Sequence, residues 1–446
     1  MDNSGVLETL ASYVPTHLLR LLLANPVPAR TPTDTHFQSA TLYAEIGGLD
    51  DLLARLIPSG EEGTRRLTQI LNAYFNLLVD FVKIEGGDIM SLSGDKALVL
   101  WPAEHESSRR ASVSALVSAA HRAAQCALSL QKMLHDYDAG DEGQLGLRMA
   151  VSAGKVYTAS VGGALGRWEF LTSGVTVAQT FGMVREAEWG DILLSPQAYA
   201  LLRTQCVGQE LPDGNFRLEN VRFPLPSRTL PPPVLEPEMA APLRAYIPGA
   251  VLNSMTTGQT GWLAELRNLS ILSINLPNVF HRTALDTMHT AMRTMQRALY
   301  RYAGSVNKLQ VGDNGMVLTA ALGLPPLSHP DDPQRAVQAA ALIVEELQKT
   351  SQSLNVGIAT GPVFCTSVGS ARRREHAMIG ETVTRARQLM AAAQQPCDGI
   401  SSDALTGIRC DAATYQATQE ALSFDAIPAT GESSPVYVPR RTDSLP

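Results

Sequence analysis

The sequence has few of the features that mark a common chemistry. The five cysteines lie far apart and show no metal-ligand spacing, at Cys126, Cys206, Cys365, Cys397 and Cys410. Because no signal peptide precedes them, they indicate reduced, mostly buried thiols in a cytoplasmic protein. No Ser-His-Asp, Cys-His or P-loop arrangement is present, so the sequence gives no support to those chemistries.

Long apolar runs and an excess of positive charge are also missing. The most membrane-like stretch, 18–24, is interrupted by Arg20 and followed closely by proline, well short of the roughly 20 apolar residues that a spanning helix needs. The formal net charge of −7 argues against a general nucleic-acid partner. We therefore expect a protein with no membrane span and no nucleic-acid partner.

The chain contains an internal repeat. Its 446 residues exceed the usual size of one domain. The segment AGKVYTASVG at 153–162 matches TGPVFCTSVG at 360–369, with equal spacing of the two glycines, and Tyr246-Ile247-Pro248 echoes Tyr13-Val14-Pro15. One domain has been duplicated.

The order of predicted elements gives the fold class. In each copy an apolar strand precedes an amphipathic helix, a hairpin and a second helix. We predict two α+β domains of ferredoxin-like, βααβ type, paired pseudo-symmetrically within the chain. The predicted boundaries are 1–37 for an N-terminal helix and linker, 38–223 for the first domain, 224–262 for a Pro-rich linker and 263–440 for the second domain.

The stretch GGDIMSLSGDKALVLW at 86–101 is the most informative part of the sequence. It predicts two short strands joined by a tight Gly94-Asp95 turn. A second carboxylate, Glu45, ends the predicted strand 40–46. A carboxylate on such a turn can hold a metal ion against a phosphate, although the sequence alone also allows Asp95 to be a turn residue and Glu45 a solvated loop acid.

This ordered set of motifs resembles the class III nucleotidyl cyclases. The tandem arrangement is similar to the catalytic half of the soluble, bicarbonate-responsive adenylyl cyclases. In the second domain the segments that resemble this family are Val306-Asn307-Lys308, 360–365 and 375–380. The resemblance covers roughly residues 38–440, and it implies conversion of ATP to cyclic AMP and diphosphate by two-metal chemistry.

The resemblance also implies roles for individual residues. Asp95 and Glu45 fall at the two metal-binding aspartates, which implies Mg²⁺ or Mn²⁺ as cofactor, although glutamate is a weakened ligand for the strict geometry of Mg²⁺. Lys308 falls at the lysine that reads the base. The implied nucleotide is a nucleoside triphosphate, ATP rather than GTP.

Other positions depart from the family pattern. The partner of the base-reading lysine falls at Ala377, the ribose-positioning asparagine at Thr384 and the transition-state arginine at Gln388. A shift of one position in the alignment would place Arg387 at the arginine instead. Each missing transition-state donor typically costs about 10²–10³ in rate.

The second, pseudo-symmetric cleft and several basic or imidazole side chains also need an interpretation. The anion-binding positions of bicarbonate-responsive relatives fall at Ser91 and Phe181, which predicts no bicarbonate control. We interpret Arg372-Arg373-Arg374 as a solvated hairpin tip, His376 as a packed histidine, and Asp313 as a turn residue.

Three hypotheses remain from the sequence. The first is an adenylate cyclase with an altered site in cyclic-nucleotide signalling. The second is a catalytically silent cyclase-homology pair, a pseudoenzyme that binds nucleotide or a regulatory protein partner. The third is a structural dimer module without any ligand.

Overall fold

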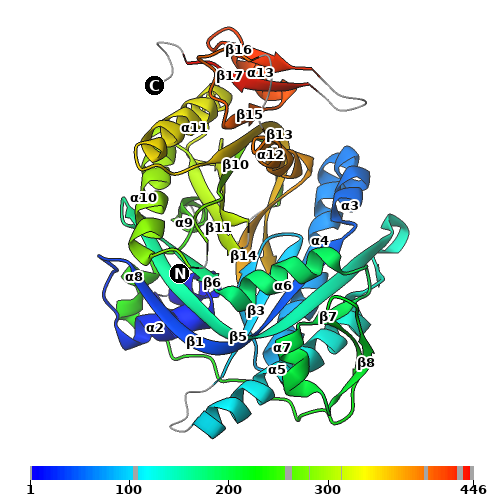
Figure 1. Cartoon of the computed structure of the whole chain (residues 1–446). Coiled ribbons are helices and arrows are strands. Elements are labelled where there is room, and N and C mark those ends of the chain that lie inside the picture. The colour runs from blue at the N-terminus through cyan, green and yellow to red at the C-terminus, as the bar shows by residue number, and fades with distance from the viewer. Residues whose placement is uncertain are drawn as a thin grey trace.

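The computed structural model describes residues 3–103, 109–256, 264–280, 282–312, 314–395, 400–428 and 435–441. It contains two mixed sheets, each with its own helices, and the two halves face each other (Figure 1). The predicted α+β tandem fold is confirmed.

The first half is built around one large sheet. Its strands follow the order β2-β3-β1-β5-β7-β9-β8, with β4 and β6 also paired to β5. The elements are α1 (Asn3–Ser12), α2 (Thr16–Ala24), β1 (Thr33–Gly47), α3 (Leu49–Leu56), α4 (Gly60–Ile84), β2 (Asp88–Leu92), β3 (Lys96–Pro102), α5 (Arg109–Leu134), β4 (Tyr137–Asp138), β5 (Gln144–Ala164), β6 (Arg167–Ser173), α6 (Val175–Glu186), β7 (Ile192–Leu194), α7 (Pro196–Leu202), β8 (Cys206–Glu210) and β9 (Phe216–Val221).

The second half repeats this topology. Its sheet has the order β11-β12-β10-β13-β15-β17-β16, with β14 paired to β13. The connecting segment carries α8 (Ala240–Arg244) and α9 (Gly249–Thr256), followed by β10 (Glu265–Leu276), α10 (Leu285–Arg301), β11 (Ser305–Gly312), β12 (Gly315–Leu322), α11 (Asp332–Gln348), β13 (Asn355–Gly369), β14 (Arg374–Ile379), α12 (Glu381–Ala392), β15 (Ile408–Cys410), α13 (Ala412–Thr418), β16 (Phe424–Ile427) and β17 (Val436–Pro439).

The helices follow the apolar spacing of the sequence. In α4, residues three and four positions apart, such as Leu67, Leu71 and Tyr74, are buried against the first sheet. In α10 the methionines Met288 and Met292 are buried in the core of the second half. These methionines therefore serve as core packing.

Each half inserts a hairpin into the core of the other. Val161 and Leu171, from β5 and β6, belong to the apolar cluster of the second half. Phe364 and Ile379, from β13 and β14, belong to the apolar cluster of the first half. Because each core is completed by the other half, the two domains hold a fixed mutual orientation.

The terminal helices and the connecting segment form a smaller apolar cluster. Leu10 and Leu18, from α1 and α2, pack with Leu243 and Val251, from α8 and α9. The segment predicted as a Pro-rich linker at 224–262 therefore contains helices that join the N-terminus to the interdomain boundary. The first strand also begins at Thr33, inside the segment predicted to precede the first domain.

The interpretation of the basic run as a solvated hairpin tip is wrong for one of its residues. Arg373 is 2% exposed, and its Nε donates to the Ile89 carbonyl at 3.0 Å while its Nη2 donates to Met90 O and Glu375 Oε2. The hairpin of the second half lies against the edge strand of the first, so Arg373 satisfies carbonyls that would otherwise be unpaired. Asp313 and Cys397, which were also interpreted from the sequence, lie outside the described residues.

Within the part of the chain that the structure covers, no helix combines the length and the apolar character needed to cross a bilayer.

Arg373 provides a test of the interdomain contact. We expect Arg373→Ala to lower the free energy of unfolding by on the order of 3 kcal/mol, because it removes a buried cation from a carboxylate and two carbonyls. Arg372→Ala is the matched control, since Arg372 is the exposed neighbour of Arg373. Urea unfolding of both variants measures the difference, and equal midpoints would contradict the assignment.

Candidate functional site

The predicted site residues converge on one cleft between the two halves. A cavity of about 290 Å³ is lined by Glu45, Lys308 and Arg387, and a neighbouring cavity of about 260 Å³ is lined by Glu45, Asp95 and Arg387. The first half supplies the two carboxylates from β1 and the β2–β3 turn, and the second half supplies the cations from β11 and α12. We call this region, defined by Glu45, Asp95, Lys308 and Arg387, the interdomain cleft.

The β2–β3 turn is fixed by contacts on both sides. Gly94 has a φ of 68°, and a Cβ there would lie 2.8 Å from Ile379 Cγ1 of the second half. The Ile46 amide donates to Asp95 O at 2.7 Å, which ties the turn to the end of β1. The turn therefore needs glycine, and it holds the Asp95 backbone next to the strand that carries Glu45.

Glu45 is paired with cations from both neighbouring strands. It lies opposite Lys96 on β3 and opposite Arg148 on β5. Arg148 donates to Glu45 Oε2 from Nε at 2.9 Å and from Nη2 at 2.6 Å, and Lys96 Nζ lies 3.3 Å from Glu45 Oε1. The Arg148 guanidinium also stacks over the Trp189 ring, 4.5 Å from its centroid.

Lys96 lies between the two predicted metal ligands. Its Nζ is 3.3 Å from Glu45 Oε1 and 3.4 Å from Asp95 Oδ2. A second cation, Arg387 Nη1, lies 3.7 Å from Asp95 Oδ2. The ammonium group therefore occupies the position between the carboxylates at which a bridging cation would sit.

This arrangement does not fit a divalent metal ion. Glu45 and Asp95 are already paired with three cations, Lys96, Arg148 and Arg387, although Asp50 and Asp51 line the same cavity. Among the residues that the structure describes, no group of three or more His, Cys, Asp or Glu side chains is arranged to hold a metal. A Mg²⁺ ion also needs ligands in near-octahedral geometry and would have to displace Lys96.

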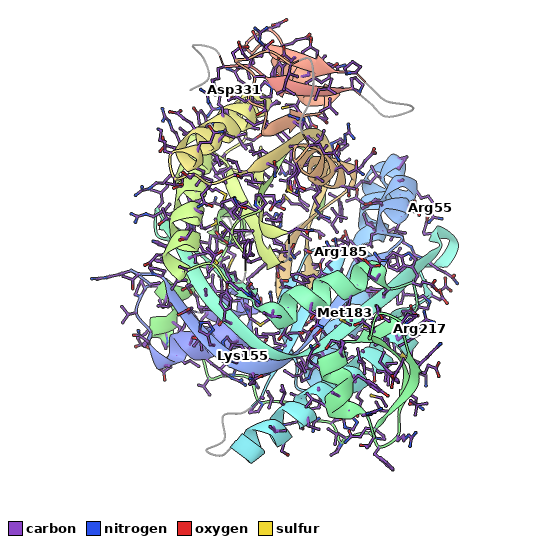
Figure 2. All side chains as sticks on the ribbon, in the orientation of Figure 1. Arg55, Lys155, Met183, Arg185, Arg217 and Asp331 are labelled. Atoms are coloured by element: carbon purple, nitrogen blue, oxygen red, sulfur yellow. The ribbon has the colours of Figure 1, made fainter. Side chains whose placement is uncertain are left out.

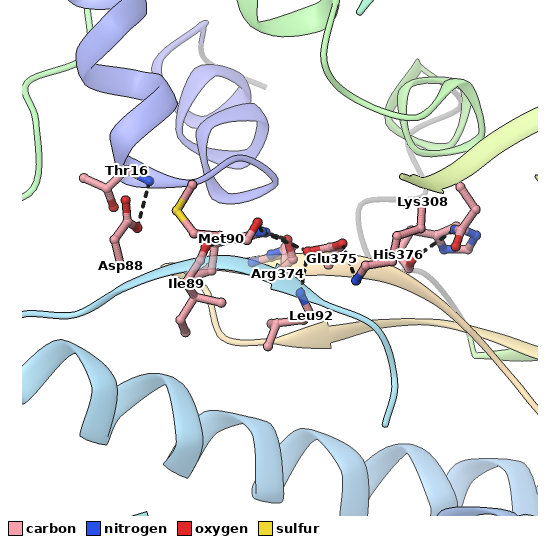
Figure 3. A network of polar contacts seen from close by, with 11 residues as sticks. Thr16, Asp88, Ile89, Met90, Leu92, Lys308, Arg374, Glu375 and His376 are labelled. Carbon is pink, nitrogen blue, oxygen red and sulfur yellow. Dashed lines mark hydrogen bonds and ion pairs between the residues drawn. The ribbon is translucent and has the colours of Figure 1, made fainter. Parts of the chain in front are cut away.

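Lys308, the predicted base reader, is engaged in the interdomain contact. Its Nζ donates to Glu375 Oε1 at 3.3 Å, while Glu375 Oε2 accepts from the Leu92 amide at 2.8 Å (Figure 3). Burial lowers the pKa of Lys308, and the Glu375 carboxylate opposes this shift. The lysine reaches the cleft, but its charge is already balanced.

The neighbouring His376 is buried at 4% exposure. Burial lowers the pKa of His376 to about 4, so the ring is neutral near pH 7. Its packing agrees with the interpretation from the sequence.

The helix α12 presents Arg387, and not Gln388, to the cleft. Arg387 lines both cavities, while Gln388 is exposed on the helix surface. Thr384, one turn earlier on the helix, lines the cavity next to Asp95, and Ala377 lines the other cavity. The cleft therefore has an arginine near the predicted place, but its asparagine and base-partner positions hold threonine and alanine.

In the second, pseudo-symmetric cleft, the two expected anion-binding positions hold Ser91 and Phe181, and neither side chain is a cation. The Phe181 ring packs against Tyr43, with centroids 4.5 Å apart, and lies close to Gly312 of the second half. A cation nearby is Arg185, on the side of α6 opposite Met183 (Figure 2); it lines the larger cavity of the cleft. The absence of bicarbonate control remains a prediction.

Sequence reasoning missed Lys96, Arg148 and Trp189. None of the three belongs to a recognisable sequence motif. The strand register alone places Lys96 and Arg148 opposite Glu45. The basic residues of β3 and β5 could have been predicted as partners of Glu45 on β1, because cross-strand pairs of opposite charge stabilise a sheet.

Comparisons with known proteins agree with this architecture. No model of a known protein family matches the chain. The chain is similar to adenylate cyclase type 10 of Oryctolagus cuniculus and of Homo sapiens, with 23% identity to each over 95% of its own length. It spans 28% of the length of these relatives.

In fold it is similar to a class III adenylyl cyclase-like ATP-binding protein from Pseudomonas aeruginosa, with a TM-score of 0.57 and 14% identity, covering 86% of this chain and 85% of that one. The resemblance to class III cyclases and their tandem fold is thereby confirmed. The pairing of Glu45 and Asp95 with internal cations does not favour the divalent metal ion expected from the sequence.

Lys96 gives a direct test of the metal-binding capacity. We expect Lys96→Met to create a site for Mn²⁺, because removal of the ammonium leaves two neighbouring carboxylates without their shared cation. Electron paramagnetic resonance titration measures free Mn²⁺, and the unaltered protein should bind at least tenfold more weakly than the variant. Lys132→Met, at an exposed lysine of α5, is the control, and tight Mn²⁺ binding by the unaltered protein would overturn the assignment of Lys96.

Proposed function

We propose that this protein is a cyclase-like signalling module that binds a nucleoside triphosphate in the interdomain cleft without efficient turnover. The observation that carries the proposal is the position of Lys96 between Glu45 and Asp95. The cation that two-metal chemistry requires is replaced by a side chain that can balance charge but cannot activate a hydroxyl as a Lewis acid. Binding is retained while the chemical step is weakened.

The cationic side chains of the cleft support an anionic ligand. Arg387 is about one-third exposed and its Nη1 makes only a long, 3.7 Å ion pair with Asp95. An arginine of this kind can bind a phosphate through two parallel hydrogen bonds. Trp189 is half-exposed beside the same cavity and offers a ring face for stacking. These side chains bind and orient a triphosphate, which we propose is ATP, the ligand in the name of the Pseudomonas aeruginosa protein.

The residues at the positions expected to stabilise charge during in-line attack support a catalytically silent protein. Thr384 replaces an asparagine and Ala377 replaces the partner of the base-reading lysine, and Lys308 is held by Glu375. Loss of one preorganised donor typically costs about 10²–10³ in rate. With these donors missing, the cleft still binds nucleotide but does not catalyse the reaction efficiently. The rigid packing of the two halves transmits the nucleotide-bound state to a regulatory protein partner.

A second candidate function is an adenylate cyclase that converts ATP to cyclic AMP and diphosphate with Mg²⁺ or Mn²⁺. It is favoured by the convergence of Glu45, Asp95 and Arg387 on one cleft. A divalent ion would supply charge neutralisation of the triphosphate. In this alternative Lys96 must move away from the carboxylates when metal and nucleotide bind together.

Nucleotide affinity tests the proposed binding. Isothermal titration of ATP in the presence of EDTA should give a dissociation constant that changes less than threefold on addition of Mg²⁺, because the cations of the site are side chains. Arg387→Ala should weaken binding about tenfold, which corresponds to about 1.4 kcal/mol. Gln388→Ala is the matched control on the adjacent, outward-facing position. The absence of any heat with ATP would reject the proposal.

Turnover separates the two candidates. We expect the purified chain with Mn²⁺ and ATP to form no more cyclic AMP than its Asp95→Ala variant, measured by mass spectrometry of the products. Formation of cyclic AMP that depends on Asp95 would establish the cyclase and reject the silent module.

A further inference from the structure

A separate cavity lies where the connecting segment meets both halves. Its volume is about 250 Å³, and its wall is built from β6, the segment from 245 to 253, the end of α10 and the loop after β12. None of the residues that define the interdomain cleft lines it. We call it the linker cavity. Sites for small molecules are found preferentially at such boundaries between domains.

The linker cavity contains one carboxylate, that of Glu169. Its Oε1 accepts a hydrogen bond from Gln296 Nε2 at 3.2 Å, and no described side chain forms an ion pair with it. Burial raises the pKa of Glu169 to about 7, and both the Gln296 hydrogen bond and the charge of Arg167 oppose this shift. Glu169 is therefore a partly buried acid on the cavity wall, with Gln296 as its hydrogen-bond donor and Arg167 as the nearby charge.

The internal repeat shows what this carboxylate lacks. Glu169 pairs across β5 with Val161, as its twin Glu375 pairs across β13 with Val368. The twin is held by three donors: Lys308 Nζ, Arg373 Nη2 and the Leu92 amide.

In the first half the corresponding cations are absent or turned away. The position that matches Lys308 is Ser91. The counterpart of Arg373 is Arg167, whose Nη1 donates instead to the carbonyls of Arg244 and Ile247. Because the Arg167 guanidinium donates to backbone carbonyls of the connecting segment, it does not pair with the Glu169 carboxylate, which lines the cavity. Arg167 still lines the cavity, but among the described residues no cation makes the close contact with Glu169 that Lys308 and Arg373 make with Glu375.

The rest of the cavity wall is mainly apolar and aromatic, with Arg167, Asn253 and Ser305 as its other polar side chains. Tyr246 and Tyr300 contribute rings, and Trp168, whose outer face stacks on His289, closes one side. Aromatic faces and a carboxylate together favour an organic cation, because the rings attract positive charge and the acid pairs with it. Burial of an anion without such a partner is unfavourable.

We propose that the linker cavity binds a small organic monocation, a primary ammonium group on an apolar body, with the ammonium on Glu169. The ligand pairs with Glu169 as Lys308 and Arg373 pair with the twin carboxylate. It contacts the connecting segment and both halves at once, so its binding stabilises their mutual packing. The site is independent of the nucleotide proposed for the interdomain cleft.

Matched ligands test the charge requirement. Benzylamine and its uncharged counterpart benzyl alcohol have the same ring, and thermal unfolding is followed with each at millimolar concentration. We expect benzylamine to raise the Tm in a concentration-dependent way and benzyl alcohol to leave it unchanged. Equal shifts with both, or no shift with either, would overturn the proposal.

Variants locate the binding site. Glu169→Gln should abolish the benzylamine shift, while Glu188→Gln, at an exposed glutamate of the same half, should retain it. If Glu169→Gln does not fold, Ala250→Met, which fills the cavity from α9, serves instead, and saturation-transfer NMR reports benzylamine binding to the unaltered chain. Retention of binding in either folded variant rejects this site. Titration with ATP is measured in parallel, and it should be unchanged in each variant.

Discussion

The exchange of hairpins between the two halves is the constraint on which the rest of the structure depends. Leu171 completes the core of the second half and Ile379 completes the core of the first. Neither half buries its apolar face alone, so the halves cannot separate without exposing both cores. The interdomain cleft, with Asp95 on one wall and Arg387 on the other, exists because this packing fixes both walls.

Within that frame, charge pairing across strands decides the chemistry of the cleft. Glu45 lies opposite Lys96 on one neighbouring strand and Arg148 on the other. The sheet therefore carries its own cations to the place where a metal site would need unpaired oxygens. The cyclase-like fold is present while Glu45 and Asp95 are paired with the protein's own cations, since a fold and the site on it are set by different residues.

The two copies of the repeat place equivalent glutamates, Glu169 and Glu375, in different surroundings. Glu375 is enclosed by donors and helps to join the halves, whereas Glu169 lines a cavity and accepts a hydrogen bond from Gln296. The difference arises from Ser91 in place of a lysine and from the linker carbonyls that hold Arg167. A structural ion pair in one copy corresponds, in the other, to an acid that has a glutamine hydrogen bond and a more distant arginine.

The sequence by itself determined the tandem α+β fold and the repeat, because apolar periodicity and turn residues are local signals. The family resemblance implied a shared role for Glu45 and Asp95, but the structure brought them together and placed Arg387, and not Gln388, beside them. Only the tertiary structure decided how those side chains are paired. Lys96, Arg148 and the buried Arg373 owe their partners to strand register and to contacts between residues hundreds of positions apart. Local sequence carries no record of such contacts, so it predicted the place of the site and left its electrostatic state to the packing of the two halves.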